Sequence, residues 1–208
     1  MPELKIDIEF YNKQLKFKKP KEIIKWALSI SENRIVTTSF GIYSEVLLST
    51  MSRYDKKIKV VWCDTLFNKQ STYEHASQLI SKYGLNIYRY QALKSKEEIE
   101  AILDYQSIDD NNFYEFSNLV KIEPFKRALT EHNPDIWFTN IRVRQTEYRD
   151  KKEILSYSKK GVLKVSPFYY WTDEDLDNYV MTNRLKKNEE YFDPVKALKN
   201  RECGIHYQ

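Results

Sequence analysis

Residues 34–44 read RIVTTSFGIYS and contain a complete passage from strand to helix. The β-branched run 34–38 predicts a short buried strand, and the apolar residues of 42–51 recur at helical spacing. Between them lies Ser39-Phe40-Gly41, where the glycine allows backbone to approach a ligand. A strand that ends in such a loop and continues as a helix begins a β-α-β unit.

The same alternation continues along the chain. Further helices are expected at 20–32, 72–83, 96–105, 123–131 and 172–183, and further strands at 57–62, 86–90, 135–139 and 162–165. Gly84 is expected to end one of these helices, and Thr172-Asp173-Glu174-Asp175 resembles a capping box that begins another. Because helices between consecutive strands make right-handed crossovers, we expect a three-layer α/β fold with a mostly parallel sheet and helices on both faces.

Composition limits the class of protein. The chain has 208 residues, of which 41% are hydrophobic and 31% charged, so we expect one globular domain, 1–208. Its last part, 186–208, is highly charged with little periodicity, and we expect a mobile C-terminal tail there. No apolar run is long enough to span a bilayer and no signal-peptide core is visible, so no membrane association and a cytoplasmic location are expected. The net charge of +4 permits anionic ligands without demanding nucleic acid.

The cysteines point to thiol chemistry. There are two cysteines and three histidines, too few for a disulfide framework and without the spacing of a zinc site, so no metal is expected. Cys203 stands in Glu202-Cys203-Gly204-Ile205-His206, in a polar C-terminal segment that favours a reactive thiol over an inert one. Cys63 ends an apolar strand, which favours structural burial over a resolving role.

Three loops carry groups that bind anions. Ligands of parallel sheets bind outside the carboxyl ends of the strands, where residues 37–44, 63–65 and 142–149 are expected. Taken alone, the first loop is as typical of a capped helix start as of a phosphate-binding site. An arginine run, taken alone, is typical of a solvated helix face. The run 142–149, with three arginines, follows another predicted strand, which favours anion binding at this edge. On a continuous helix Arg142 and Arg149 would share a face, with Arg144 pointing elsewhere.

Several motifs together resemble those of one family. They are Thr38-Ser39-Phe40-Gly41, Asp64-Thr65, Lys121-Ile122-Glu123-Pro124, the segment 137–149 and Arg201-Glu202-Cys203-Gly204-Ile205-His206. The sequence is similar, from about residue 34 to its end, to the assimilatory sulfonucleotide reductases, whose fold is adenine nucleotide alpha hydrolase-like. It departs from them at Leu66 and Asn140, where the family usually has glycine, and at Val143, where it has arginine.

The cysteine count selects a branch of this family. One branch reduces adenylyl sulfate and binds an iron–sulfur cluster, which needs about four thiolates, whereas this chain has two cysteines. The resemblance is therefore to the cluster-free branch, which reduces 3′-phosphoadenylyl sulfate (PAPS). It implies no cofactor, reduced thioredoxin or glutaredoxin as co-substrate, and a homodimer.

The resemblance also implies site residues. Cys203 would be the catalytic nucleophile, forming an S-sulfonate from which sulfite is released during sulfate assimilation. The substrate-binding residues it implies are Ser39, Phe40, Gly41, Ser44, Asp64, Thr65, Lys121, Arg142, Gln145, Arg149, Arg201 and His206. For His206 the sequence leaves two roles equally open: it could orient the thiol of Cys203, or it could contact an anion.

Other functions fit parts of the same pattern. Reduction of adenylyl sulfate without a cluster would use the same nucleophile. An ATP pyrophosphatase of the same fold would keep the glycine loop but would not need Cys203. A catalytically dead nucleotide-binding protein fits the altered loop after Asp64.

Overall fold

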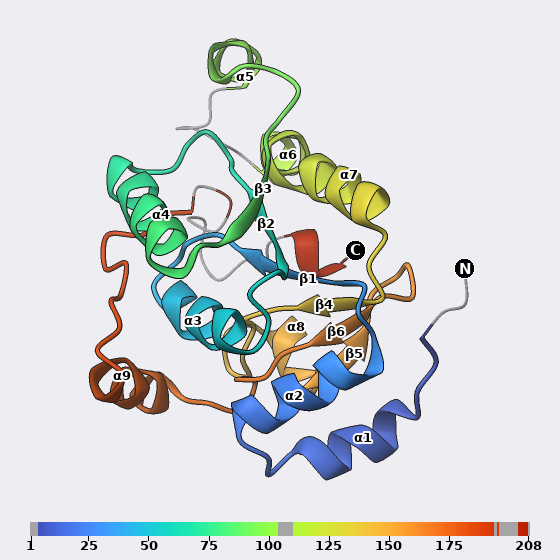
Figure 1. Cartoon of the computed structure of the whole chain (residues 1–208). Helices are drawn as coiled ribbons and strands as arrows, with labels where there is room; N and C mark the ends of the chain where they lie inside the picture. Colours follow the sequence, from blue (N-terminus) through green and yellow to red (C-terminus); the bar gives the residue numbers. More distant parts are fainter. Residues whose placement is uncertain (1–3, 104–109, 194, 196–203, 208) are drawn as a thin grey trace.

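The structure is a computed structural model that describes residues 4–103, 110–193, 195 and 204–207. Its centre is a six-stranded sheet of order β3-β2-β1-β4-β6-β5 (Figure 1). The strands are β1 (Arg34–Thr38), β2 (Lys59–Cys63), β3 (Asn86–Tyr90), β4 (Ile136–Phe138), β5 (Leu155–Tyr157) and β6 (Leu163–Val165). Four of the pairings are parallel, and only β5 runs antiparallel to its neighbour β6. The predicted mostly parallel sheet is confirmed.

Helices cover both faces of this sheet. The α-helices are α1 (Ile8–Leu15), α2 (Pro20–Ile30), α3 (Ser44–Tyr54), α4 (Gln70–Tyr83), α5 (Lys96–Ile102), α6 (Asp110–Ser117), α7 (Glu123–His132), α8 (Glu147–Asp150) and α9 (Asp173–Thr182). In Figure 1, α2, α3 and α4 lie on one face, and α6 and α7 lie on the other. Neighbouring residues of β1 and β2 accordingly alternate between two buried clusters: Val36 and Val60 belong to one, and Ile35 and Val61 to the other. The expected three-layer α/β fold is confirmed.

Most predicted elements are found close to their expected bounds. The strands 34–38 and 86–90 are confirmed without change. Gly84 ends α4 in the left-handed conformation, with φ of 58°, and the side chains and backbone of Thr172 and Asp175 form the predicted capping box. The pattern missed α1, α6 and β5. Strand β5 has three residues, too few for a period-two pattern to stand out.

A π-helix, Asn118–Ile122, joins α6 to α7. Its position follows from Pro124, the second residue of α7, which has no N–H to donate to the carbonyl of Val120. The N–H of Glu123 reaches back to the carbonyl of Asn118, which is the wider π-type bond. This widened turn carries Lys121, whose side chain is 4% exposed, on the face of the sheet covered by α7.

Within the segment expected as a mobile tail, the structure describes 186–193, 195 and 204–207, and each of these parts includes a buried residue. Residues 186–193 run across the loop after β1, where Asn188 Nδ2 donates to the carbonyl of Phe40 at 2.8 Å. The C-terminal turn, Gly204–Tyr207, is a 3-10 helix that lies near the edge of α7 and above β4 and β6 (Figure 1). Arg201 and Cys203 lie outside the described residues. The extent of the domain, 1–208, and the mobility of its tail stay predictions.

Within the part of the chain that the structure describes, no helix has both the length and the apolar character needed to cross a bilayer.

Candidate active site

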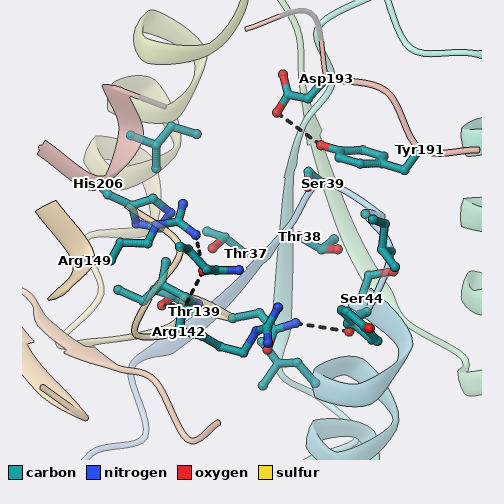
Figure 2. A pocket seen from close by; sticks show the side chains of 18 of the residues that line it. Thr37, Thr38, Ser39, Ser44, Thr139, Arg142, Arg149, Tyr191, Asp193 and His206 are labelled. Carbon is teal, nitrogen blue, oxygen red and sulfur yellow. Dashed lines mark hydrogen bonds between the residues drawn. The ribbon is translucent and has the colours of Figure 1, made fainter. Parts of the chain in front are cut away.

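The strand order locates the principal cavity. The chain proceeds from β1 outward to β2 and β3, then returns to β4 on the other side of β1, so the direction of the order reverses between β1 and β4. At such a switch point a crevice opens outside the carboxyl ends of the two strands. A cavity of about 820 Å³ lies there, lined by the loop after β1, the loop after β4, the π-helix and described parts of the tail (Figure 2).

The loop after β1 forms one wall. Phe40 has φ of 51° and a fully buried side chain, which packs edge-on against Trp62. Phe40 was predicted to bind substrate, but its ring points into the core and does not line the cavity. Gly41 does line it, and a Cβ added to Gly41 would lie 3.3 Å from Cε1 of Tyr191. The glycine therefore lets the tail residue Tyr191 approach the loop closely.

Ser44, at the start of α3, is held by a histidine. Its hydroxyl oxygen lies 3.3 Å from Nε2 of His75, and both side chains are buried. Burial lowers the pKa of His75 below its ordinary value, which favours the neutral imidazole at this position. Ser44 also lines the cavity together with Ser39, and it is the first residue of α3, where the helix dipole favours an anion.

The loop after β4 supplies two buried guanidinium groups. Arg142 is 8% exposed and Arg149 is 6% exposed, and both line the cavity. Gln145 connects them, because its side-chain oxygen accepts from the backbone N–H of Arg142 at 2.8 Å and from the guanidinium of Arg149. The guanidinium of Arg142 donates to Asp173 at 2.7 Å. Figure 2 shows Arg142 and Arg149 on the same side of the cavity as Thr139.

The geometry that brings the two arginines together differs from the predicted helix face. Helix α8 spans only Glu147–Asp150, so Arg149 is helical and Arg142 lies in the preceding loop. Arg144, between them, has φ of 64° and an exposed side chain at the rim of the cavity. The prediction that Arg144 points away from the other two arginines is therefore wrong: it lines the same cavity and differs from them in being exposed.

A buried ion pair forms the opposite wall. Nζ of Lys121, on the π-helix, lies 2.5 Å from a carboxylate oxygen of Asp193, and both side chains are almost fully buried. Tyr191 donates its hydroxyl to the same carboxylate at 3.1 Å. Burial, followed by the charge of Asp193, raises the pKa of Tyr191. The sequence predicts the charged segment 186–193 only as part of a tail, and its pattern does not indicate that Tyr191 and Asp193 line a cavity.

Two predicted site residues lie elsewhere. Asp64 and Thr65 follow β2, one strand away from the switch point, and neither lines the cavity. Asp64 is fully buried and accepts hydrogen bonds from Arg89, Gln91 and Tyr73. Burial by itself raises its pKa, but the hydrogen bonds from Gln91 and Arg89 outweigh that and hold the pKa below its ordinary value. Its role in the structure is to join β2, β3 and α4. Cys63, the last residue of β2, is buried and does line the cavity.

The C-terminal turn completes the cavity. Ile205 and His206 line it and are 8% and 9% exposed. The ring of His206 stacks on Trp137, and its backbone carbonyl accepts hydrogen bonds from Lys164 and Tyr148. The predicted residues Ser39, Gly41, Ser44, Lys121, Arg142, Gln145, Arg149 and His206 therefore meet at one cavity. Among the described residues, no cluster of three or more histidine, cysteine or acidic side chains could hold a metal ion.

A doubly wound sheet with cationic and hydroxyl groups at its switch point defines an α/β protein of the adenine nucleotide alpha hydrolase-like class. Solved structures agree. Phosphoadenylyl-sulfate (PAPS) reductase from Candida auris, in a phosphate complex, superposes with a TM-score of 0.76 and 26% identity over 88% of each chain. FMN adenylyltransferase from Candida glabrata shares the fold alone, with a TM-score of 0.57 and 13% identity over 78% of this chain and 54% of that one.

Sequence comparison identifies the family. The model of the phosphoadenosine phosphosulfate reductase domain matches residues 33–196. Phosphoadenosine 5′-phosphosulfate reductase of Synechococcus sp. is 30% identical over 89% of this chain and 81% of its own length. The protein of that name from Xylella fastidiosa is 33% identical over 86% of this chain and 76% of its own length. The chain belongs to the phosphoadenosine phosphosulfate reductase family of oxidoreductases, as its sequence motifs predict.

Proposed function

We propose that this protein reduces PAPS to sulfite and adenosine 3′,5′-bisphosphate in sulfate assimilation, with Cys203 as the nucleophile. Its electron donor in this proposal is a dithiol protein, thioredoxin or glutaredoxin. One observation carries the proposal: the C-terminal turn, which directly follows Cys203 in sequence, is part of the wall of the cationic cavity at the switch point. The described turn that follows Cys203 in sequence therefore contributes Ile205 and His206 to the lining of this cavity, which supports the proposal.

The charges of the cavity suit a sulfonucleotide. PAPS carries a phosphosulfate and a 3′-phosphate, and guanidinium groups bind such oxygens with paired, charge-assisted hydrogen bonds. Arg142, Arg149 and Lys121 supply the cations. Ser39 and Ser44 supply hydroxyl groups, and Ser44 is the first residue of α3. In this proposal Arg201 adds a further cation next to Cys203. Because Asp173 and Asp193 already pair with Arg142 and Lys121, substrate oxygens would compete with these two carboxylates.

The reaction balances in two steps. The thiolate of Cys203 attacks the sulfur of the sulfate group, the bond from that sulfur to the bridging phosphate oxygen breaks, and adenosine 3′,5′-bisphosphate leaves with the electron pair. A thiolate of the donor then attacks Sγ of the Cys203 S-sulfonate, and sulfite leaves with the S–S electron pair. The second donor thiol resolves the mixed disulfide and returns Cys203 as a thiolate. The donor is oxidised to a disulfide while the sulfur is reduced from sulfate to sulfite.

The surroundings must favour the thiolate. A free cysteine has a pKa of about 8.5, so only a few per cent is ionised at neutral pH. Substrate anions would raise that pKa further, and the cations of the cavity, Lys121 and Arg149 among them, would offset this. His206 serves in this proposal mainly to hold the turn, since its ring is stacked on Trp137.

Further parts of the proposal rest on the composition of the sequence and on its likeness to the family, and not on the geometry of the cavity. They are a single domain, 1–208, a homodimer, a cytoplasmic location, and the absence of an iron–sulfur cluster, which two cysteines could not ligate within one chain.

The deciding experiment is mass spectrometry of the intact protein. The reduced protein is incubated with PAPS in the absence of any thiol, and an adduct of one SO₃ group is expected on the peptide that contains Cys203. Addition of reduced thioredoxin should remove the adduct and release sulfite. Cys203→Ser should form no adduct yet bind adenosine 3′,5′-bisphosphate, and Cys63→Ala should still form it. A parent protein that binds PAPS but forms no adduct would refute the proposal and favour a nucleotide-binding protein without this activity.

The nucleotide preference needs its own measurement. The same incubation with adenylyl sulfate reports the role of the 3′-phosphate. Faster sulfonation by PAPS is expected. An equal or greater rate with adenylyl sulfate would support the alternative of a cluster-free adenylyl sulfate reductase.

A further inference from the structure

The backbone carbonyl of His206 is held by two side chains from different elements. Nζ of Lys164, in β6, donates to this oxygen at 2.9 Å, and the hydroxyl of Tyr148, in α8, donates to it at 2.6 Å. Neither residue lines the cavity, so neither is placed to contact the substrate. Both contacts act on the backbone of the C-terminal turn, so they hold it whatever the side chain at 206 does.

Lys164 is an unusual residue for the middle of a sheet. It is 1% exposed and pairs in register with Trp137 of β4, whose ring centroid lies 4.8 Å from its Nζ. Burying an ammonium group costs several kcal/mol unless polar or charged groups solvate it. In this sheet the carbonyl of His206 and the face of Trp137 do so, and both belong to the contact with the turn.

The start of the turn, at Gly204, packs closely against Ile122 of the π-helix. A Cβ added at Gly204 would lie 2.4 Å from Cδ1 and 2.9 Å from Cγ1 of Ile122, so the turn approaches the π-helix at a distance that only glycine allows. Ile122 directly follows Lys121, which lines the cavity. The turn is therefore bounded by Ile122 at its start and by Lys164 and Tyr148 near its end.

We propose that Lys164 and Tyr148 are positioning residues: by binding the carbonyl of His206 they hold the C-terminal turn, which directly follows Cys203 in sequence, against the wall of the cavity. This inference rests on the proposed function, in which Cys203 attacks bound PAPS. Holding the residue next to a nucleophile reduces the conformational freedom lost on reaching the transition state. The two residues would thus increase the rate of thiol sulfonation without contributing to nucleotide affinity.

The first test needs no substrate. Amide hydrogen exchange of the peptide that contains 204–207, followed by mass spectrometry, reports how firmly the turn is held. Lys164→Met keeps most of the aliphatic volume and removes the donor, and Tyr148→Phe removes one oxygen atom. Each variant should exchange this peptide about tenfold faster, because one hydrogen bond is lost. Lys159→Met, in the exposed hairpin turn before β6, is the matched control and should exchange like the parent.

The second test separates positioning from structure. In single-turnover sulfonation by PAPS, Lys164→Met and Tyr148→Phe should each react about tenfold more slowly. The dissociation constant for adenosine 3′,5′-bisphosphate should stay within about twofold of the parent. Lys159→Met should match the parent in both measurements. If Lys164→Met does not fold, Tyr148→Phe decides the test, since it removes only the hydroxyl group that donates to the carbonyl of His206.

The outcomes separate the two proposals. No adduct in the parent refutes the proposed function, whereas faster exchange in the variants would still support the hold on the turn. Adduct formation at the parent rate in both variants, with unchanged exchange, would overturn the positioning inference and leave the proposed function intact. Equal losses of nucleotide affinity and of rate would also overturn it, because they would indicate general damage to the cavity.

Discussion

The imidazole ring of His206 lies parallel to the indole ring of Trp137, with ring centroids 5.6 Å apart and an interplanar angle of 2°. Trp137 is fully buried in the centre of β4, and its Nε1 donates to the hydroxyl of Thr37 near the end of β1 at 2.8 Å. One tryptophan therefore connects the last residues of the chain with the strand that leads into the anion-binding loop. The C-terminal turn covers part of the sheet as a helix would, and its loss should affect the body as well as the chemistry.

Removal of residues 204–208 is therefore expected to lower the free energy of unfolding by about 2–4 kcal/mol, because the buried ammonium of Lys164 loses its carbonyl partner and Trp137 loses its cover. Urea denaturation of the parent and the truncated protein measures this. Introduced into the truncated protein, Lys164→Met should recover part of the lost free energy of unfolding. Introduced into the full chain, it should not raise the free energy of unfolding. Equal stability of parent and truncated proteins would show that the turn adds nothing to the body.

Gly204→Ala should loosen the turn, because the new methyl group would overlap the side chain of Ile122. We expect a loss of about 1–3 kcal/mol, as for overpacking in a core. Ile122→Ala opens space at the same contact, so the double variant should be more stable than the sum of the single losses predicts. Thermal unfolding of the four proteins of this cycle measures the coupling. Strictly additive losses would mean that Gly204 and Ile122 do not meet.

Asp193→Asn should cost about 3–5 kcal/mol of stability, because it leaves the ammonium of Lys121 buried without its carboxylate. Replacing both residues, Lys121→Met with Asp193→Leu, should cost much less, since no charge is then left buried. Urea denaturation distinguishes the two cases. A double variant less stable than Asp193→Asn would indicate that the pair stabilises the fold beyond mutual neutralisation.

Arg142→Ala and Arg149→Ala should each weaken binding of PAPS by about 1.5–3 kcal/mol, the range of a charge-assisted contact. Arg144→Ala is the matched control and should do much less, because its side chain is exposed at the rim whereas the other two are buried in the wall. Calorimetric titration with adenosine 3′,5′-bisphosphate and PAPS measures all three. Similar small losses at the three positions would indicate a general electrostatic field instead of a defined site.

Stability should fall as the pH drops below about 6.5. Burial holds the pKa of His75 and of His132 below the ordinary value of 6.5. Below that pH the unfolded chain binds protons at these positions that the folded chain does not, so protonation favours unfolding. The free energy of unfolding, measured in urea at pH 7.5, 6.5 and 5.5, should show the decline. His75→Gln with His132→Gln should flatten it, and an unchanged slope would contradict the assignment.

Much of the fold could be predicted from local pattern. The strands 34–38 and 86–90, the stop at Gly84 and the cap at Thr172 are set by residues within a few positions of one another, so a short window contains the physics that decides them. The short strand β5 has too few residues for a period-two pattern to stand out, and the π-helix before Pro124 has no sequence pattern of its own.

The kinds of chemical group in the site could also be predicted from the sequence, but the set of residues that line the cavity could not. The sequence by itself determined the residue types: a loop with hydroxyl groups and a glycine, a run of arginines, and one cysteine near a C-terminal histidine. Only the tertiary structure decided that Asp64 joins strands instead of lining the cavity, that Tyr191 and Asp193 line it, and that Lys164 holds the turn beside Cys203. The reason is the order of strands in the sheet. That order comes from the packing of whole layers, and it places the cavity between β1 and β4, whose residues are distant in sequence.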